Sequence, residues 1–431
     1  MKTTKIIFTF TLLIILSVSL VVTGCGGGDS TEDGAADVGG KVLKVGILGP
    51  FTGHNARIGE EFKGAVEMAF ARVDNKIGDY NVEFVWIDSQ SDPEKATRAY
   101  EEAVLRDNID VGLLNWHSSV AVACMDVAAR NQIPHFFTLG ATEVVNEKYE
   151  SDPELYSYWL KGWATPYKLS GAYVEALTEA TEKGLWEPRN NRVAVYGEDT
   201  DWGRSYGASF KSDFQEIGWE VVGEEYFTPG ETELVPLLYS LRDMDASVIV
   251  GSMGSPPSWA AFIKQAQEVG IQSVIIADGL GWVGEWYEMT GDASNYILDQ
   301  IPAWTTPEAL QFKDDFENKY GITPSTSGAA LPYDYVCFFI EIAQKTLEEY
   351  GELNKETIYN YSQEKVWTGQ HTYSDGIIME DYSFNAESVP DPVVGQGHFI
   401  FPVIQYYEGQ GKIMWPDVWK EADFMSPAYI N

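Results

Sequence analysis

Positive charge is scarce in this sequence. Its 431 residues include 29 Lys and Arg against 65 Asp and Glu, which gives a formal net charge of −36. Nucleic-acid binding depends on basic groups that neutralise phosphates, so this composition argues against a nucleic-acid partner. It also argues against adhesion to anionic lipid. Two explanations of the acidic composition remain open. It would give a mild preference for cationic or zwitterionic solutes, or it would only make the surface soluble.

Cysteine and histidine are rare as well, with three and five residues. The histidines are His54, His117, His135, His371 and His398. They show no H-x-x-x-H or H-E-x-x-H spacing, and the sequence has no P-loop, so we expect neither a metal site nor a cofactor. Cys124 and Cys337 lie in apolar, helix-like stretches that nothing in the sequence brings together. We expect two buried free thiols, with a disulfide as the alternative.

The sequence has no long apolar run after residue 22. Residues 6–22 form an apolar run that follows Lys2 and Lys5 and ends in Val22-Thr23-Gly24-Cys25. A positive start, an apolar stretch and small residues at its end describe a secretory signal. The alternative is a spanning helix, but the run is short of the ~20 residues that one needs. The ending resembles a bacterial lipoprotein signal, which implies a signal peptide at 1–24, a lipid on Cys25 and a flexible tether at 25–40.

Short apolar strands and amphipathic helices alternate from residue 41 onward. In the first block, strands at 44–48, 81–88, 109–114 and 134–139 alternate with helices at 59–73, 92–105 and 120–129. In the second block, strands at 192–197, 219–225, 247–251 and 273–277 alternate with helices at 202–217, 234–241 and 259–269. Helices at 307–320 and 331–350 and a β-like end at 398–415 follow. This alternation predicts two α/β lobes with parallel, doubly wound sheets.

Ligands of such sheets bind at the loops that follow the strands. Ser118 and Ser119 begin a helix, where hydroxyl and free N–H groups favour a carboxylate; ordinary N-capping is the alternative. Thr142 offers another hydroxyl after the next strand. Asp278 ends an apolar strand and would suit an ammonium group, or would be an ordinary turn acid. Trp202 would cover an apolar part of a ligand, or would simply pack in the core.

Two strings resemble enzyme motifs. Gly203-Arg-Ser-Tyr-Gly207 matches the G-x-S-x-G pattern, but Ser205 falls within a predicted helix and not on a sharp turn after a strand. Gly279-Leu-Gly-Trp-Val-Gly284 matches G-x-G-x-x-G and follows a strand, but a dinucleotide fingerprint belongs at the first strand–helix turn of a domain. We interpret the second string as turn chemistry.

Several segments carry a family resemblance. These are Gly49-Pro-Phe-Thr-Gly53, Asp88-Ser-Gln-Ser-Asp-Pro93, Ser118-Ser119, Gly140-Ala-Thr142 and the strand and loop at 193–203. Here the chain resembles the branched-chain amino acid-type solute-binding proteins of ABC importers, which are type I periplasmic binding proteins. The resemblance implies two doubly wound parallel-sheet α/β lobes, joined by a hinge, with the ligand cleft between them. We assign residues 41–162 and 305–390 to the first lobe and residues 163–304 and 391–431 to the second.

The same resemblance implies roles for the site residues. The hydroxyls of Ser119 and Thr142, with backbone amides near Ser118, would hold a ligand carboxylate. A backbone carbonyl at Gly140 or Ala141 and the acid Asp278 would hold an ammonium, and Trp202 would cover the ligand from the second lobe. Four places depart from the family pattern. Asp278 replaces the more usual Glu, and Trp202 replaces Tyr. The segment Asn115-Trp116-His117 is bulkier than the small residues usual before the serines, and Arg57 places a cation near the ligand side-chain loop.

We therefore expect a solute-binding protein, not an enzyme. It would be anchored by lipid in the periplasm or at the cell surface, and would deliver an amino acid, an amide or a small carboxylate to the permease of an ABC importer as a monomer. One alternative is a sensory module that presents its ligand to a receptor. Another is a secreted serine hydrolase that uses Ser205.

Overall fold

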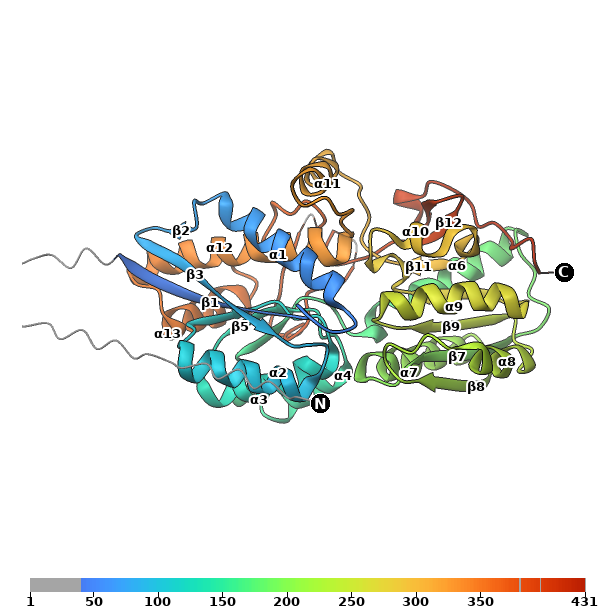
Figure 1. The fold of residues 1–431 in the computed structure, drawn as a ribbon, viewed down its shortest axis with the longest axis horizontal. Coiled ribbons are helices and arrows are strands. Elements are labelled where there is room, and N and C mark those ends of the chain that lie inside the picture. Colours follow the sequence, from blue (N-terminus) through green and yellow to red (C-terminus); the bar gives the residue numbers. More distant parts are fainter. Residues whose placement is uncertain (1–39, 380, 396, 431) are drawn as a thin grey trace, which may run out of the picture. The chain divides into compact units, whose positions relative to one another are not determined.

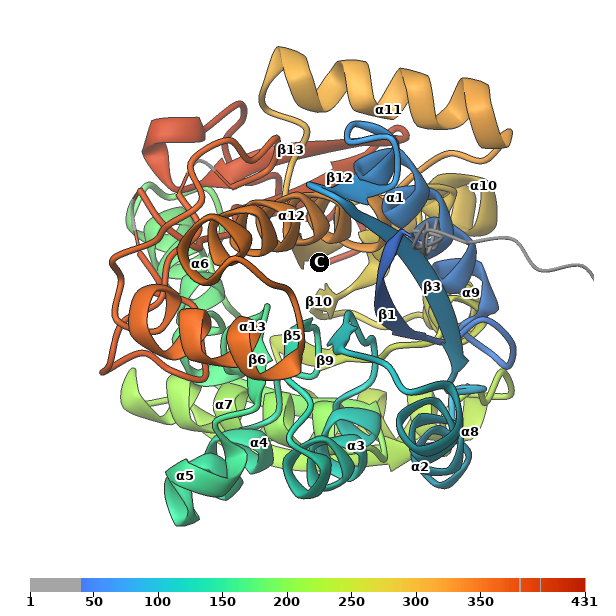
Figure 2. The ribbon, with the colours of Figure 1, turned by 90° about the vertical axis from the view of Figure 1, so that its left-hand side faces the viewer.

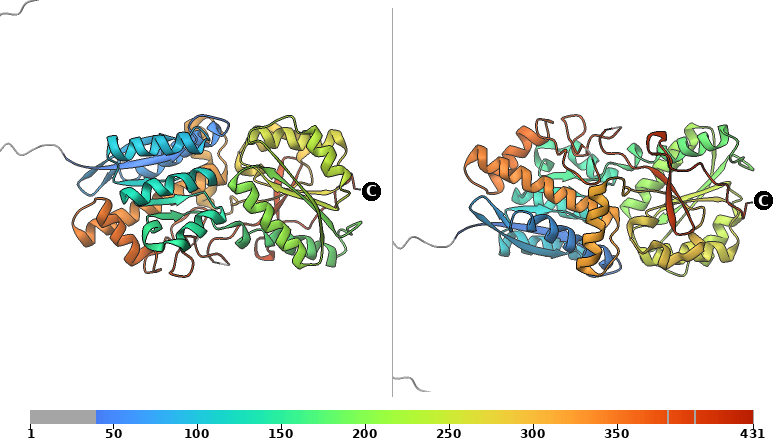
Figure 3. Two further views of the ribbon diagram at one scale, coloured as in Figure 1. Left: turned by 90° about the horizontal axis from the view of Figure 1, so that it is seen from below. Right: turned by 90° about the horizontal axis from the view of Figure 1, so that it is seen from above.

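The computed structural model describes residues 40–379, 381–395 and 397–430. From Gly40 onward the chain builds two β-sheets that lie next to each other, each with helices on both faces (Figure 1 and Figure 3). The predicted signal peptide, Cys25 and the tether up to residue 39 lie outside the described residues. Two mostly parallel sheets covered by helices confirm the predicted α/β class.

Among the described residues, the first sheet has six strands in the order β2-β3-β1-β4-β5-β6. Their bounds are β1 Lys41–Gly49, β2 Lys76–Ile77, β3 Tyr80–Asp88, β4 Val111–Leu113, β5 His135–Thr138 and β6 Trp159–Lys161. All neighbours are parallel except β2 and β3. Every residue of β4 and β5 is buried, because helices cover both faces of the sheet.

In the part of the chain that the structure describes, eight α-helices accompany the first sheet. They are α1 Ala56–Ala71, α2 Pro93–Glu102, α3 Ser118–Asn131, α4 Glu143–Ser151, α5 Pro153–Tyr156, α11 Pro307–Tyr320, α12 Leu331–Tyr350 and α13 Lys355–Tyr361. Figure 2 shows α1 and α12 on one side of the sheet and α2 and α3 on the other, and each of these pairs is in contact. The Asp92 side chain accepts the Lys95 N–H and Pro93 opens α2, which confirms the predicted start of that helix.

The second sheet, as far as the structure describes the chain, has seven strands in the order β13-β12-β11-β10-β9-β7-β8. Its strands are β7 Arg192–Glu198, β8 Glu220–Phe227, β9 Val248–Ser252, β10 Val274–Asp278, β11 Leu298–Gln300, β12 Val403–Tyr407 and β13 Gln410–Trp415. Its helices are α6 Gly171–Glu182, α7 Asp201–Glu216, α8 Val235–Asp243, α9 Pro256–Val269 and α10 Trp286–Thr290. Strands β12 and β13 pair antiparallel, so this sheet is mixed where a purely parallel one was expected.

In the described residues, the chain passes between the two sheets three times, after β6, after β11 and before β12. Asp391 ties the first and third of these crossovers together. Its carboxylate pairs with the ammonium groups of Lys161 and Lys168 at 2.8 Å each and accepts the Thr165 N–H at 3.3 Å. Burial lowers the pKa of Lys161, while the two ammonium groups hold the pKa of Asp391 below its usual range. The lobe boundaries proposed from the sequence stay predictions.

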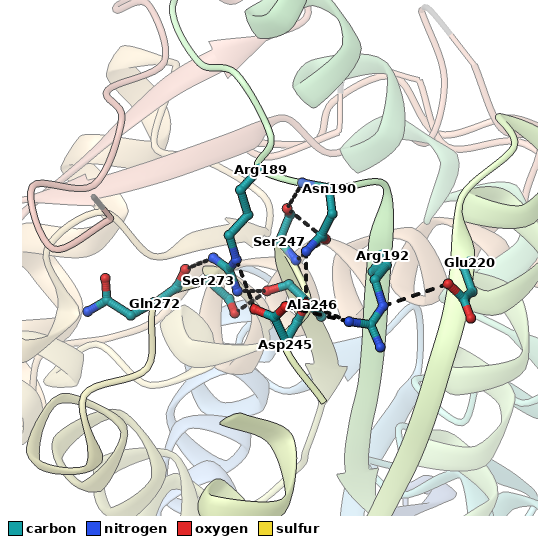
Figure 4. A network of polar contacts seen from close by, with 9 residues as sticks. All are labelled: Arg189, Asn190, Arg192, Glu220, Asp245, Ala246, Ser247, Gln272 and Ser273. Carbon is teal, nitrogen blue, oxygen red and sulfur yellow. Dashed lines mark hydrogen bonds and ion pairs between the residues drawn. The ribbon is translucent and has the colours of Figure 1, made fainter. Parts of the chain in front are cut away.

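A polar network fixes the amino ends of the central strands of the second sheet (Figure 4). The Arg189 guanidinium donates to the Ala246 carbonyl at 2.6 Å, to the Gln272 carbonyl and to the Asp245 carboxylate at 3.2 Å. Ser247 and Asn190 exchange hydrogen bonds beside it. These contacts join the segments that lead into β7, β9 and β10, at the sheet edge opposite their carboxyl ends.

Cys124 on α3 and Cys337 on α12 are both buried and free, as expected. Within the described ranges, no helix is both long enough and apolar enough to cross a membrane. The described residues also hold no group of three or more His, Cys, Asp or Glu side chains suited to a metal ion.

Candidate ligand-binding cavity

Each sheet has a point where the strand order reverses, and both points face the same cavity. In the first sheet β1 lies between β3 and β4, and in the second β7 lies between β8 and β9. Neighbouring loops diverge at such a point, which leaves a crevice outside the carboxyl ends of the strands. A cavity of about 240 Å³ opens there. The fold therefore places a site where the loops of both sheets meet.

The walls of the cavity come from both sheets and from one crossover. The loops and helix starts that follow strands of the first sheet supply nine residues, and the first crossover supplies Trp163. The nine are His54, Ser91, Pro93, Trp116, His117, Ser118, Ser119, Val120 and Leu139. The second sheet supplies Glu198, Asp199, Thr200, Trp202, Pro229, Gly254 and Trp282. A ligand inside would contact both halves at once.

The structure brings together three of the seven predicted ligand residues, Ser118, Ser119 and Trp202. The serines open α3, whose N-cap residue His117 makes no side-chain cap hydrogen bond. The Ser118 hydroxyl accepts the Thr142 N–H at 3.3 Å, and the Ser119 hydroxyl accepts the Asp201 N–H from the other half at 3.5 Å. Neither serine caps α3, so the alternative reading as N-caps is wrong.

The other four predicted residues lie behind the cavity wall. Thr142 is the N-cap of α4 and accepts the Val144 N–H. The Ala141 carbonyl accepts a hydrogen bond from the Lys161 ammonium at 3.1 Å. Gly140 packs so closely on α3 that a Cβ there would overlap the Ala121 methyl group. Asp278 is fully buried, as described next.

Asp278 is linked to Trp202 by hydrogen bonds through Ser252. The Trp202 indole Nε1–H donates to the Ser252 hydroxyl at 2.6 Å, and that hydroxyl donates to the Asp278 backbone carbonyl at 2.9 Å. Tyr173 donates its hydroxyl to the Asp278 carboxylate at 2.9 Å. Burial, with the neighbouring Asp299 charge, raises the pKa of Asp278 well above its usual value. Contact between its carboxylate and a ligand ammonium stays a prediction.

The sequence reasoning missed the acid that lines the cavity, Glu198 at the end of β7. This side chain is only 3% exposed. Its Oε2 accepts the Gly254 N–H at 2.8 Å, whereas its Oε1 has no hydrogen-bond partner among the described residues. Burial raises the pKa of Glu198, against the opposing effect of nearby backbone N–H groups. The only sequence signal for this acid was its position directly after the apolar strand predicted at 192–197.

The aromatic walls were also missed as a set. Trp282 lies 5.4 Å from Trp116, 5.5 Å from Trp202 and 6.1 Å from Trp163, measured between ring centroids. These indoles come from four segments far apart in the chain. No local sequence pattern connects them.

His54 and His117 line the cavity from the loops that follow β1 and β4. Asn55 Nδ2 donates to His117 Nε2 at 2.8 Å, so the neutral imidazole carries its proton on Nδ1. Burial, with His54 alongside, lowers the pKa of His117 to about 3. Burial also lowers the pKa of His54. Both imidazoles are therefore neutral near pH 7.

The other residues that the sequence analysis singled out make contacts outside the cavity lining. Arg57 does not line the cavity; its guanidinium bonds to the Glu285 carboxylate at 2.6 Å and to the Thr323 carbonyl at 2.8 Å. Ser205 lies within α7, and its hydroxyl accepts the Glu143 N–H at 3.3 Å. The N–H groups of Gly279 and Gly281 bond to the buried Asp299 carboxylate at 2.7 and 2.8 Å. The glycine string is thus a turn built around an internal acid.

Comparison with known proteins agrees with this geometry. Residues 42–364 match the family model described as periplasmic binding protein. The Leu/Ile/Val-binding protein homolog 6 of Brucella suis is 25% identical over 233 residues, which are 54% of this chain and 56% of that protein. The chain thus matches only about half the length of that relative. Homolog 7 of the same organism is 24% identical over 341 residues, covering 74% of this chain and 79% of the relative.

Solved structures share the fold. A branched-chain amino acid transporter substrate binding protein of Streptococcus pneumoniae, in complex with isoleucine, has a TM-score of 0.68 at 18% identity and covers 86% of this chain and 98% of its own. A solute binding protein of an ABC transporter from Rhodopseudomonas palustris, in complex with benzoate, has a TM-score of 0.69 at 17% identity and covers 86% and 95%. These neighbours hold ligands as different as an amino acid and an aromatic acid.

Proposed function

Because this chain belongs to the periplasmic binding protein family, we propose that it is the extracytoplasmic solute-binding component of an ABC importer. It would capture an amino acid or a related small polar or carboxylate solute and deliver it to a membrane permease. The single observation that carries the proposal is the cavity, which loops from both sheets and a crossover enclose together. A site built from two halves is suited to capture and release.

The proposed mechanism is hinge closure about the crossovers. The ligand would first bind at Ser118 and Ser119, and rotation would then bring Trp202 onto it. Closure needs a ligand that interacts more favourably with the closed form than with the open one, and a solute touching both halves meets this condition. Gly140, Ala141, Thr142 and Asp278 would shape the site from behind.

The membrane attachment is proposed on the sequence alone. Cys25 would carry a lipid, and the tether that follows it would hold the receptor near its permease. A Cys25→Ser variant should then lose incorporation of a labelled fatty acid and be released from the membrane fraction. Retention of the label in that variant would contradict the assignment.

Calorimetry tests the function directly. The chain from Gly40 onward, one compact unit, would be titrated with amino acids, amides and small carboxylates. We expect saturable binding of one solute class with one site per chain. Ser119→Ala should weaken it about tenfold, as the loss of one hydrogen bond to a charged group predicts.

Arg189→Met, at the far edge of the second sheet, is the control and should leave the affinity unchanged. Esterase activity lost in a Ser205→Ala variant that still binds its solute would instead favour a hydrolase. If the folded protein bound neither these three classes nor any other small polar solute, the proposal would be wrong.

A further inference from the structure

The charged groups that line the cavity are acidic. Among the described residues, no lysine or arginine lines it, and its carboxylates are Glu198 and Asp199. Asp199 is exposed and pairs with Arg204 at 2.8 Å, whereas Glu198 is buried without a counter-ion in contact. His54 and His117, which also line the cavity, are neutral near pH 7. An anionic group placed beside Glu198 would meet repulsion, and a cationic group would be attracted.

Four indole rings line the same cavity as this carboxylate, those of Trp116, Trp163, Trp202 and Trp282. Trp282 meets Trp116 at 88° and Trp163 at 81°, and Trp163 meets Trp202 at 87°. Trp202 and Trp282 meet at 56°, so the four rings that line the cavity differ in orientation. Indole is the aromatic side chain that attracts cations most strongly, and aromatic cages of this kind recognise quaternary ammonium groups.

The number of hydrogen-bond acceptors distinguishes between kinds of ammonium. A primary ammonium donates three hydrogen bonds, and losing them on burial is unfavourable unless acceptors replace water. Among the described residues that line the cavity, Glu198 Oε1 is a buried carboxylate oxygen without a hydrogen-bond partner, and the indole Nε1–H groups are donors. A trimethylammonium group has no N–H to satisfy, and its methyl groups bury well against indole faces.

We propose that the solute carries a trimethylammonium group, which the four tryptophans enclose and Glu198 neutralises. The inference rests on the proposed function, that a small solute binds in this cavity, and names the class of that solute. The Ser118 and Ser119 end of the cavity would take the opposite, polar end of the molecule, such as the carboxylate of a betaine or the hydroxyl of choline. The acidic partner of the ligand is then Glu198, and Asp278 acts only through Ser252 and Trp202.

Calorimetry with matched probes tests the charge. Choline and 3,3-dimethyl-1-butanol have the same shape, but only choline is a cation. The full chain would be titrated with choline, glycine betaine, 3,3-dimethyl-1-butanol, leucine and benzoate. We expect choline or glycine betaine to bind, and choline to bind at least tenfold more tightly than its neutral analogue if choline is the ligand recognised. For glycine betaine the matching probe is 3,3-dimethylbutanoate, which keeps the carboxylate and replaces the cationic nitrogen by carbon, with the same expected ratio.

Variants test the residues. Glu198→Gln keeps the shape of the side chain and should weaken trimethylammonium binding at least tenfold, and Trp282→Leu should do the same by removing one wall. Glu216→Gln makes the same charge change on the exposed last turn of α7 and should leave the affinity unchanged. Thermal melting of each variant checks that it is folded, and the two cavity variants are independent of each other.

The outcomes separate the two proposals. Binding of leucine or benzoate, with neither trimethylammonium solute bound, overturns this inference and leaves the solute-binding function standing. Equal affinity for the cation and its neutral analogue, or unchanged affinity in both Glu198→Gln and Trp282→Leu, also overturns it. If the folded protein binds none of the probes and none of the amino acids, amides and carboxylates tested above, both proposals fail.

Discussion

Single residues in this protein combine burial with polar contacts that fix their protonation state. His135 in β5 is a clear case. Its Nε2–H donates to the Leu114 carbonyl at 2.7 Å, its Nδ1 accepts the Tyr100 hydroxyl at 2.8 Å, and its ring stacks on Trp159 with centroids 4.2 Å apart. The imidazole is neutral, and each of its two nitrogens has a hydrogen-bond partner.

This environment predicts acid destabilisation. Burial lowers the pKa of His135 to about 3 in the folded state, below the ordinary 6.5 of the unfolded chain. The unfolded chain therefore binds more protons between these values, so the stabilisation is present above pH 6.5 and is lost as the pH falls towards 3. The loss amounts to as much as about 5 kcal/mol at the lower end.

Urea unfolding from pH 7 to pH 4 measures this effect. In His135→Gln, whose side chain still donates to the Leu114 carbonyl but does not titrate, the free energy of unfolding should depend less steeply on pH. A slope identical to that of the unchanged chain would show that His135 does not contribute.

Most secondary-structure elements were predictable from the sequence. The strands at 192–197, 247–251 and 273–277 lie within one residue of β7, β9 and β10, because buried parallel strands read as short apolar runs between turn residues. Strands β6 and β11 were missed because each has only three residues and polar side chains interrupt it, Lys161 in β6 and Asp299 and Gln300 in β11. Their pairing depends on neighbours distant in the chain. The equally short β4 was predicted because it lies within a longer apolar run.

The site was predictable only in part, for the same reason. The loops after the strands were expected to hold it, and Ser118, Ser119 and Trp202 do line the cavity. The indole walls need four loops to converge, and the burial of Glu198 depends on Gly254 from another strand end. Contacts between loops that are distant in the chain cannot be predicted from a local sequence pattern.

The start of α7 controls the position of Glu198. A Cβ at Gly203, in the first turn of α7, would overlap the Glu198 carbonyl oxygen. We expect Gly203→Ala to displace this loop, to lower the free energy of unfolding by about 1–3 kcal/mol and to weaken ligand binding. Urea unfolding and calorimetry measure the two effects.

Gly171 provides a matched control at the start of another helix. It opens α6, and a Cβ there would meet no atom within 4 Å. Gly171→Ala should therefore be neutral or slightly stabilising, since alanine favours helix over glycine. If Gly203→Ala were equally well tolerated, the close packing of α7 on the Glu198 loop would have no energetic consequence.

In the molecule as a whole, an ion pair away from the cavity joins the two halves. Arg57 on α1 reaches Glu285, just before α10, at 2.6 Å, and the two side chains are 22% and 21% exposed. Since this pair spans both halves, it should favour the closed form. We expect Glu285→Gln to weaken solute binding about three- to tenfold although Glu285 does not line the cavity.

Calorimetry at low and high salt checks this expectation, because screening should reduce the difference between the variant and the unchanged chain. Glu288→Gln, which alters an exposed acid on α10, is the control. Unchanged affinity in Glu285→Gln at low salt would mean that the pair does not bias closure.

The three crossovers also have a consequence for the order in which the protein can fold. The helix α12 packs against α1 from the opposite end of the sequence, and β11 finds a hydrogen-bonding partner in β12, about a hundred residues later. Neither half is therefore complete until almost the whole chain has been synthesised. Contacts of such long sequence separation slow folding. A nascent chain that stops before Val403 leaves the edge of β11 open, and an open edge invites pairing with other chains.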